Sequence, residues 1–454
     1  MTVAESFAEF AVGLRDHPLP DGALNGARRC LVDWWGGTIA GGVEAPATVL
    51  VAALRPGGGP SRLLPSGDGT DMRTAALING TAAHSVEVDD IYSPGLYHPG
   101  VSVISAALAA AEGEGASGAD LLTAIVAGYE VSNRIARAIN PAHYRYWHTT
   151  ATVGYFGAAV AAACAMRLSA GQTAHALTTT ATFAAGLRHA FASDAMSKPL
   201  HAGRAAEGGV FAALGARHGL TGVPDIFEAA RGFGAVMSEA VDWDRSVAGL
   251  GTEWTIERIT CKPYPCCGHA FAAIDAARAI MGGGVEPGEI ERIEVGTYRA
   301  GVEICENRDP STPYEAKFSI PYCVALAALN RPIDLAAFTP GGLYDGELRA
   351  MMARVELVLD PAAEAAFPAM RAAEVAISTR GGLEQRYRQP TRRGDPDFPM
   401  SDADIDTKFR MLAGPVIGPQ AAAALSGVLW RVDELETVAL IPIAEMVANC
   451  PIPS

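Results

Sequence analysis

The chain has 454 residues, of which 49% are hydrophobic and 19% charged, and its formal net charge is -15. This length favours two domains over one, and the composition is typical of a folded, well-buried protein rather than a disordered one. The negative net charge argues against a nucleic-acid partner, because nucleic-acid binding normally rests on a basic face. A small anionic substrate is still compatible with it, since a local cluster of cations can oppose the overall field.

The N-terminal stretch does not have the pattern of a secretion signal, because Glu5 and Glu9 stand where such a signal carries positive charge. The longest uncharged run lies between His148 and Arg167 and is built from Ala, Thr and Gly. That composition is typical of a buried helix rather than a membrane span. We therefore expect a cytoplasmic protein with no membrane partner.

The first half of the chain is a series of helical periods separated by Gly, Pro and Asp clusters. No alternating strand pattern interrupts the series between Glu5 and about Met237. Small side chains dominate it, so we expect helices that pack at close approach. The predicted helices cover residues 24–42, 71–88, 101–113, 119–139 and 151–168.

After Trp254 the pattern changes to alternating apolar and polar residues, which indicates strands. Helical segments lie between the strands, so this part of the chain is predicted to be a smaller α+β domain. The predicted strands lie within residues 255–265, 290–300, 353–360 and 374–380, and the predicted helices are 269–281 and 320–329.

The tail from Ser401 is predicted to be helical again, over 401–414, 421–429 and 434–445. We expect it to return and pack on the first domain. The fold class is therefore mainly α with an α+β second domain. The helical domain spans residues 1–254 and is completed by 400–454, and the inserted α+β domain spans 255–399.

Lysine is rare in this chain, and its few positions are informative. Lysine and arginine together number 35, yet lysine occurs only at Lys198, Lys262, Lys317 and Lys408. Lys198 precedes Pro199 at the start of an Ala- and Gly-rich helical stretch. Since the chain uses arginine for nearly every other cation, a lysine at this place suggests a specific role.

Other basic side chains also stand directly before or within the first turn of predicted helices. His98 precedes Pro99, His148 stands beside the possible N-cap Thr149, and His201 follows Lys198. Helix N-termini already favour anions, so added cations there indicate a pocket for a carboxylate-rich substrate. A lysine buried beside other cations is expected to have a lowered pKa and to serve as an acid or a base.

Carboxylates lie close in sequence to these cations. Glu87, Asp89 and Asp90 precede His98 by a few residues, and they could orient the histidines or transfer protons. Simpler alternatives stay open for each residue taken alone. A histidine before a helix can be a turn residue, and Asp89 and Asp90 can end a helix in a solvated turn.

A metal centre is not expected, although Cys261, Cys266, Cys267 and His269 are close in sequence and Lys262 lies among them. Adjacent cysteines do not readily bind one tetrahedral ion together, and no second ligand pair completes a set. No dinucleotide or P-loop pattern is present either, so we expect no cofactor. Reduced, mostly buried thiols are expected at Cys30, Cys164, Cys261, Cys266, Cys267, Cys305, Cys323 and Cys450.

Six stretches in this order together resemble the MmgE/PrpD family, which includes 2-methylcitrate dehydratases, cis-aconitate decarboxylases and iminodisuccinate epimerases. They are NGTAAHSVEVDDIY with the following HPG, YWHTTATVGYFGAA, SKPLHAGRAAEGGVFAA, KPYPCCGHAFAAIDAA, EAKFSIPYCVALAAL and MSDADIDTKFRMLAG. The resemblance implies a large helical domain with an inserted α+β lid domain, in a homodimer. It also implies activity on small di- and tricarboxylates without metal or organic cofactor.

Carried over residue by residue, the family's active-site pattern falls on His98, His148, Lys198, Lys262 and Tyr322, with an acidic position at Glu87. The predicted supporting residues are Glu87, Asp90, His201, Cys267 and His269. Two positions depart from the decarboxylase pattern. Glu87 stands where the decarboxylase has an aspartate, and Cys267 where it has a histidine.

We therefore expect a lyase that eliminates water or carbon dioxide from a small di- or tricarboxylate. A two-base epimerase or isomerase of a small dicarboxylate is the alternative, because it needs the same cations and a pair of acid and base groups. A carboxylate-binding protein without catalysis is a further alternative from a different class.

Overall fold

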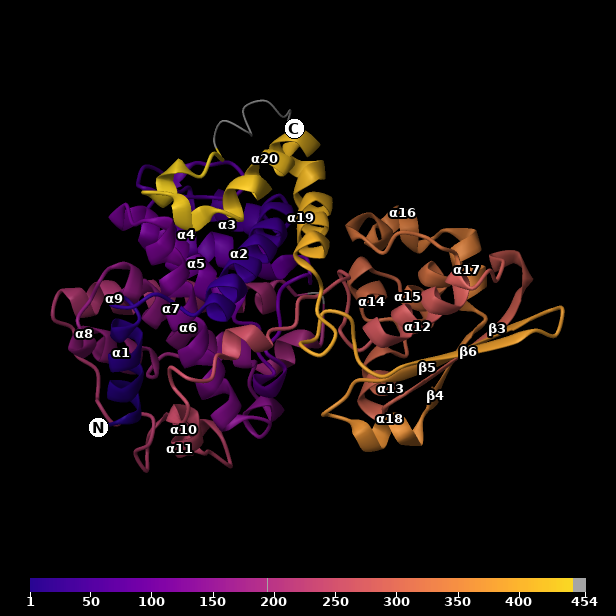
Figure 1. Cartoon of the computed structure of the whole chain (residues 1–454), viewed down its shortest axis with the longest axis horizontal. Helices are drawn as coiled ribbons and strands as arrows, with labels where there is room; N and C mark the ends of the chain where they lie inside the picture. The colour runs from indigo at the N-terminus through magenta and orange to yellow at the C-terminus, as the bar shows by residue number, and fades with distance from the viewer. Residues whose placement is uncertain (194, 444–454) are drawn as a thin grey trace. The chain divides into compact units, whose positions relative to one another are not determined.

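The computed structural model describes residues 1–193 and 195–443 and divides into two compact units. Unit 1 consists of Met1–Cys261 together with the tail from Ser401, and unit 2 consists of Lys262–Met400. The tail lies against the N-terminal helices of unit 1, where Figure 1 shows α19 and α20 in yellow. Residues 255–261 belong to unit 1 because Thr260 exchanges backbone hydrogen bonds with Ile91.

Unit 1 is built almost entirely from helices that bury small side chains against each other. Its central helices are α4, α5, α6, α7 and α9, and every residue of α7 is buried. The helices are α1 (Val3–Gly13), α2 (Asp21–Gly42), α3 (Ala47–Leu54), α4 (Met72–Ser85), α5 (Gly100–Glu114), α6 (Gly118–Ile139), α7 (Thr149–Ala165), α8 (Ala170–Thr180), α9 (Ser197–Arg217), α10 (Phe233–Met237), α11 (Trp243–Val247), α19 (Asp402–Ile417) and α20 (Pro419–Leu429).

Local sequence signals explain where several of these helices begin. Asp71 caps α4 by accepting hydrogen bonds from two backbone N–H groups, and Ser117 caps α6 by accepting one, from the Asp120 N–H. Ser401 and Asp404 form a reciprocal capping box at the start of α19. These caps satisfy N–H groups that the first turn of a helix leaves without partners.

Helices α4 and α9 approach closely because glycine occupies their contact. A Cβ atom built on Gly203 of α9 would lie 2.1 Å from the backbone oxygen of Leu77 on α4. Gly80 of α4 faces the same contact, since a Cβ there would lie 3.0 Å from the Cα of Gly203. The close approach brings the first turn of α9, with Lys198, near the C-terminal end of α4.

The C-terminal tail completes unit 1. Helix α19 packs on α2, and the Arg28 guanidinium on α2 makes two hydrogen bonds of 3.0 and 2.7 Å to the Asp433 carboxylate. Lys408 on α19 is buried, forms an ion pair with Asp33 on α2 and donates a hydrogen bond of 2.7 Å to the Val88 carbonyl. The tail therefore contacts both α2 and the loop after α4.

Unit 2 contains a four-stranded mixed sheet in the order β4-β3-β5-β6. Strands β3 and β4 are parallel, and the other two pairs are antiparallel. Helices α12 and α15 pack against the sheet and supply much of a core that includes Phe271, Ile293 and Val375. The strands are β3 (Ile290–Thr297), β4 (Val355–Leu359), β5 (Ala373–Thr379) and β6 (Glu384–Gln389), and the helices are α12 (Phe271–Gly282), α13 (Arg299–Cys305), α14 (Pro313–Lys317), α15 (Ile320–Ala328), α16 (Pro340–Leu343), α17 (Gly346–Met352) and α18 (Pro361–Ala366).

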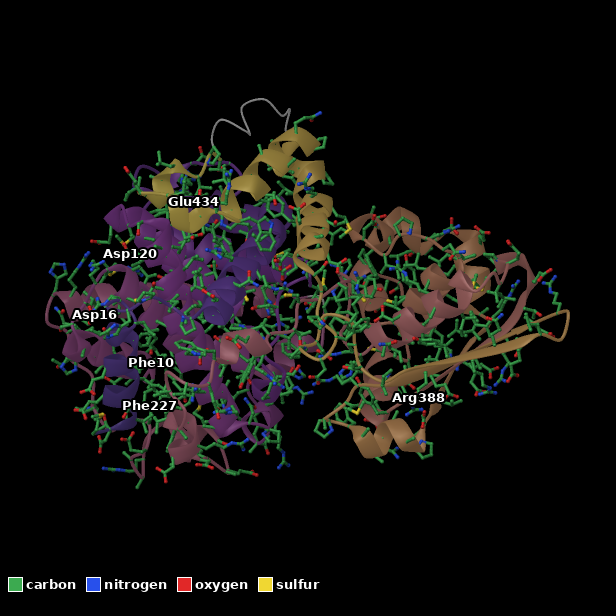
Figure 2. The ribbon with its side chains drawn as sticks, in the orientation of Figure 1. Phe10, Asp16, Asp120, Phe227, Arg388 and Glu434 are labelled. Carbon is green, nitrogen blue, oxygen red and sulfur yellow. The ribbon has the colours of Figure 1, made fainter. Side chains whose placement is uncertain are left out.

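Figure 2 shows how side chains of different character are placed within each unit. Phe227 is fully buried in unit 1, where its ring lies 5.0 Å from that of Phe156. Glu434 of the same unit and Arg388 on β6 of unit 2 are exposed. Phe227 is thus one of the aromatic rings in the interior of unit 1, whereas Glu434 and Arg388 lie on the surfaces of their units.

The structure confirms a mainly helical protein with a small mixed sheet in the second part of the chain, and it corrects some details. The predicted strand within 255–265 is wrong: Thr255–Arg258 is a 3₁₀ helix, η4. The reason is that Glu130 on α6 accepts hydrogen bonds from the Thr255 hydroxyl and the Ile256 N–H, at 2.9 and 3.0 Å. This buried carboxylate takes the place of a partner strand.

Four further corrections concern short elements, a polar strand and a helix cap. Unit 1 contains a hairpin of two-residue strands, β1 (Ser61–Arg62) and β2 (Gly69–Thr70), which are too short to produce an alternating pattern. The polar edge strand β6 was missed because its side chains are mostly exposed. The residue at the N-cap of α7 is His148 rather than Thr149. Within the described residues, the predicted helix 434–445 contains the 3₁₀ turn Val438–Leu440 and the last residue of the 3₁₀ turn Val432–Glu434, and residues 444–445 lie outside the described residues.

Among the described residues, no single helix has both the length and the apolar composition needed to cross a membrane. Helices α2 and α3 meet those criteria only when taken together, and they are bent by 66° at the break between them.

Candidate functional site

The acidic segment after α4 is buried rather than solvated. Helix α4 ends at Ser85, and Asp89 and Asp90 are only 7% and 4% exposed. Glu87 adopts a positive φ of 63°, an uncommon conformation for a residue with a side chain. The solvated-turn alternative for Asp89 and Asp90 is therefore wrong.

Glu87 forms an ion pair with Lys198 on the first turn of α9. Burial by itself lowers the pKa of Lys198, but the charge of Glu87 and its hydrogen bond outweigh burial and raise this pKa above its ordinary value. The prediction that the pKa of Lys198 is lowered is therefore wrong, because it considered burial and neighbouring cations but not the charge of Glu87. Lys198 stays protonated at neutral pH.

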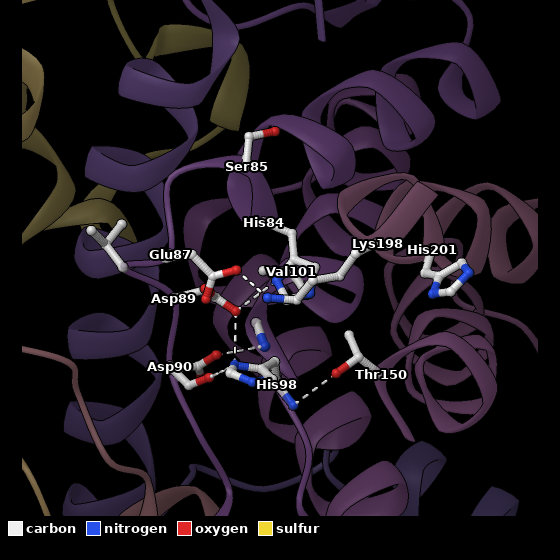
Figure 3. Close-up of polar contacts among 12 residues, drawn as sticks. His84, Ser85, Glu87, Asp89, Asp90, His98, Val101, Thr150, Lys198 and His201 are labelled. Carbon is white, nitrogen blue, oxygen red and sulfur yellow. Dashed lines mark hydrogen bonds and ion pairs between the residues drawn. The ribbon is translucent and has the colours of Figure 1, made fainter. Parts of the chain in front are cut away.

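Asp89 and Asp90 have different partners. The Asp89 carboxylate oxygen Oδ2 lies 2.8 Å from Nδ1 of His84 and 2.8 Å from Nδ1 of His98 (Figure 3). The Asp90 carboxylate instead accepts hydrogen bonds from the Tyr129 hydroxyl and the Gly100 N–H, at 2.7 and 3.0 Å. Burial raises the pKa of Asp90 to about 7.

His98 is held by both its backbone and its ring. Its N–H donates to the Thr150 hydroxyl on α7 at 3.2 Å, and its Nδ1 lies 2.8 Å from the Asp90 carbonyl oxygen. A carbonyl oxygen can only accept, so Nδ1 of His98 carries the proton when the ring is neutral. Nε2 then has an unprotonated lone pair, on a side chain that is 21% exposed.

Four imidazoles lie close together in this part of unit 1. The ring centroid of His84 is 5.3 Å from that of His98 and 5.6 Å from that of His148. The ring of His148 is 5.4 Å from that of His201, and their Nδ1 atoms are 3.1 Å apart. We call His84, His98, His148, His201, Lys198 and their carboxylate partners Glu87 and Asp89 the imidazole cluster.

Burial and mutual repulsion keep most of these rings neutral. The pKa of His148 is lowered well below its ordinary value, first by burial and then by the neighbouring His84 and His201. Burial and His84 lower the pKa of His201 to about 4. Burial also lowers the pKa of His84, against the opposing effect of Asp89.

A cavity of about 700 Å³ lies beside the cluster, with His201 in its lining. Trp147, Gly186, His189 and Ser197 also line it. The volume is in the range of small-molecule binding sites. Because the His201 ring belongs to both the cavity and the cluster, a small molecule in the cavity would contact an imidazole of the cluster.

The remaining predicted site residues belong to unit 2. Cys267 is half-buried there, and Lys262 is 2% exposed. The Tyr298 hydroxyl lies 2.6 Å from Nδ1 of His269, and burial with the charge of Arg371 lowers the pKa of His269 to about 3. The contacts given for these residues are all with other residues of unit 2.

Tyr322 lies in the hydrophobic core of unit 2, and its hydroxyl donates a hydrogen bond of 2.5 Å to the Ala337 carbonyl. Hydrogen bonding to Cys267 and burial together raise the pKa of the Cys305 thiol well above its ordinary value. The cysteines of the described residues are free thiols, as expected, and Cys450 lies outside the described residues.

The structure brings together six of the predicted residues in unit 1: Glu87, Asp90, His98, His148, Lys198 and His201. Sequence reasoning missed His84. The available signal was an imidazole in the last turn of α4, at the start of the acidic segment. Within residues 1–193 and 195–443, no three His, Cys, Asp or Glu side chains are arranged to hold a metal ion.

Two features define the class of protein. One is the mainly helical fold of two units, and the other is a buried lysine–carboxylate pair beside several imidazoles. Residues 5–246 match the MmgE/PrpD N-terminal domain, and residues 264–433 match the MmgE/PrpD C-terminal domain. The chain therefore belongs to the MmgE/PrpD family.

Relatives with established names are similar along nearly the whole chain. The cis-aconitate decarboxylase of Mus musculus is 27% identical over 97% of this chain and 92% of its own length. The human enzyme of that name is 26% identical over 97% of this chain and 94% of its own length. The cis-aconitate decarboxylase of Aspergillus terreus is 24% identical over 100% of this chain and 97% of its own length.

Proposed function

We propose that the protein is a cofactor-independent lyase that removes carbon dioxide or water from a small di- or tricarboxylate. The observation that carries the proposal is a protonated lysine beside neutral imidazoles in one buried cluster. The raised pKa of Lys198 keeps its ammonium charged at neutral pH, and the lowered pKa values of His148 and His201 keep those rings neutral. The cluster thus offers a cation for a carboxylate and bases for a proton.

Lys198 is the proposed binding group for a substrate carboxylate. An ammonium has three N–H donors, and Glu87 accepts from Lys198 in the structure. A substrate carboxylate reaching Lys198 would bind a cation that is desolvated, where electrostatic attraction is stronger than in water. The cavity lined by His201 and Ser197 lies next to this turn of α9.

His98 is the proposed proton-transfer residue, because its Nε2 lone pair lies on the partly exposed edge of the cluster. In a dehydration, Nε2 takes a proton from carbon, the electron pair forms the double bond, and a second group protonates the departing hydroxyl. In a decarboxylation, carbon dioxide leaves its electron pair on carbon, and a protonated group returns a proton there. The names of the relatives favour decarboxylation.

The test is a panel of polycarboxylates, including cis-aconitate and 2-methylcitrate, incubated with the purified protein in deuterated water. Carbon dioxide release, alkene absorbance and deuterium in recovered substrate are measured together. Gas release indicates decarboxylation, and alkene formation without gas indicates dehydration. Deuterium uptake with neither product would instead establish the epimerase alternative, and binding without any conversion would establish a carboxylate-binding protein.

Lys198→Ala is the matching variant. We expect it to lower kcat/KM by at least about 100-fold, because a charged donor is removed from a buried site. Its circular dichroism and melting temperature serve as folding controls. Unchanged turnover in a folded Lys198→Ala protein would contradict the assignment of this lysine.

We further propose that the chain acts as a cytoplasmic homodimer, as its sequence led us to expect. A solution mass of twice the 47.2 kDa of one chain, measured by light scattering, checks the dimer.

A further inference from the structure

One carboxylate oxygen of Asp89 lies beside two imidazoles of the cluster. Its Oδ2 atom lies 2.8 Å from Nδ1 of His84 and 2.8 Å from Nδ1 of His98. The Asp89 side chain is 4% exposed, and the His84 side chain is 0% exposed. An ionised carboxylate only accepts hydrogen bonds, so Nδ1 of His84 donates to Asp89. The single Nδ1 proton of His98 lies between two acceptors, the Asp90 carbonyl oxygen and the Asp89 carboxylate.

With Nδ1 of His84 directed at Asp89, the second ring nitrogen of His84, Nε2, is left without a hydrogen-bond partner among the described residues. This Nε2 atom is also buried. A buried nitrogen without a partner is unfavourable, so a specific force must hold the ring in place. The hydrogen bond from Nδ1 to Asp89 supplies that force, while stacking on His148 at an interplanar angle of 17° fixes the ring plane.

The three carboxylates of the acidic segment therefore have separate partners. Glu87 pairs with Lys198, and Asp90 binds the Tyr129 hydroxyl and the start of α5. Asp89 is the carboxylate directed at the rings. A negative charge at this position also favours a positive charge on His98, which forms when its Nε2 takes up a proton.

We propose that Asp89 is a positioning residue for proton transfer: it holds His84 with Nδ1 protonated and Nε2 unprotonated, it supports the same form of His98 together with the Asp90 carbonyl, and it balances the charge that His98 gains. This inference rests on the proposed function for its catalytic part. Its structural part, the tautomer of the two rings, does not depend on any activity. In a dehydration, the carbon-bound proton passes to Nε2 of His98 and its electron pair forms the double bond. In a decarboxylation, Nε2 of the protonated His98 ring returns a proton to the carbon that keeps the electron pair of the departing carbon dioxide. Nδ1 of His98 keeps its own proton in both cases.

The structural part is tested by nitrogen-15 NMR of the histidine rings in the wild-type protein, with His84→Gln and His98→Gln used to assign the signals. We expect a proton on Nδ1 of both rings and none on Nε2 of His84. His84 is the decisive ring, because Asp89 is its hydrogen-bond partner, whereas His98 also has the Asp90 carbonyl. A proton on Nε2 of His84 would overturn the proposal, whatever the protein catalyses.

The catalytic part is tested with Asp89→Asn, which keeps the shape and one acceptor but removes the charge. We expect kcat to fall by roughly 100- to 10,000-fold, as for other carboxylates that orient a catalytic imidazole. KM should change much less than kcat, because Lys198 keeps its ion pair with Glu87. A variant with wild-type kcat would overturn this role, and a loss confined to KM would do the same.

Asp90→Asn is the matched control for the ring signals. It changes the adjacent buried carboxylate, whose side chain contacts Tyr129 and Gly100 rather than an imidazole. We expect its His84 signal to match the wild type, whereas Asp89→Ala should lose the preference for a proton on Nδ1. Equal changes in the two variants would indicate a general disturbance and contradict the specific role. If neither variant folds, the wild-type spectrum still decides the question.

Discussion

Lys198 and Lys408 share a residue type and burial, but they have different partners and therefore different roles. Lys198 pairs with Glu87 next to the imidazoles, whereas Lys408 pairs with Asp33 and binds the Val88 carbonyl. The scarcity of lysine indicated that each position was specific. It could not separate a site residue from a structural one, because that difference depends on residues distant in sequence.

The Glu87–Lys198 pair leads to a prediction about pH. Glu87 is the largest effect that raises the pKa of Lys198 against burial, with smaller contributions from Asp89 and Tyr144. In Glu87→Gln the largest opposing effect is lost, so this pKa falls. Lys198 then loses its proton at lower pH than in the wild type. We expect the alkaline limb of the kcat/KM profile to move down by about 1 to 3 pH units, the usual effect of removing a close opposite charge.

Glu207→Gln is the control for this profile. Glu207 is also a buried carboxylate on α9, but its partners are Arg73 and Arg204, and arginine does not titrate in the accessible range. Its alkaline limb should coincide with that of the wild type. A limb that stays in place in Glu87→Gln would show that Lys198 does not act as a cation in turnover.

At the same scale, part of the site could be predicted from sequence. His98, His148 and Lys198 stand directly beside helix starts, and that local position is visible in the sequence. His84 lies inside the last turn of α4, where a histidine usually has no role in a functional site. His84 belongs to the imidazole cluster because it contacts Asp89 across a loop, and no local sequence pattern encodes that contact.

At the scale of elements, helices were predictable where apolar periodicity is long and caps are present. The predicted helix 119–139 corresponds to α6, Gly118–Ile139, which begins at a serine cap. Apolar and polar residues alternate in the segment 255–265 as in a strand. This alternation places side chains on two sides of the backbone but does not supply a strand for it to pair with. The buried Glu130 bonds its first residues, and without a neighbouring strand no sheet forms there.

The contact between α4 and α9 predicts the effect of a single added methyl group. Gly203→Ala would place a Cβ atom 2.1 Å from both the Leu77 carbonyl oxygen and the Thr81 hydroxyl, so the helices must separate. We expect the free energy of unfolding to fall by about 1 to 3 kcal/mol, the usual cost of overpacking. Turnover should fall as well, because Lys198 on α9 would move away from Glu87.

Gly427→Ala on α20 is the matching control, since nothing lies within 4 Å of a Cβ built there. Alanine stabilises a helix interior over glycine by up to about 1 kcal/mol, so this variant should be equally or more stable than the wild type. Both are measured by chemical denaturation. Wild-type stability in Gly203→Ala would mean that the two helices can separate without cost.

At the scale of the whole molecule, helices α19 and α20 near the end of the chain pack on α2 near its beginning, within unit 1. The pattern of apolar and polar residues predicted that the tail is helical and returns to the first domain, since the α+β segment interrupts a helical pattern. It could not predict where the tail binds, because that depends on individual pairs such as Arg28 with Asp433. The pair of Lys408 with Asp33 extends this contact to the carbonyl of Val88, between Glu87 and Asp89.

The tail therefore supports the acidic segment, and two variants separate that role from stability. Lys408→Met leaves the buried Asp33 carboxylate without its cation, which should lower the free energy of unfolding by about 3 to 5 kcal/mol. Asp33→Asn combined with Lys408→Met removes the buried charge, so most of that stability should return. Turnover should stay low in both, because the Val88 carbonyl has lost the Lys408 donor and the flanking carboxylates lose their support. Denaturation and steady-state kinetics on both proteins check this, and full recovery of turnover in the double variant would show that the tail contributes stability alone.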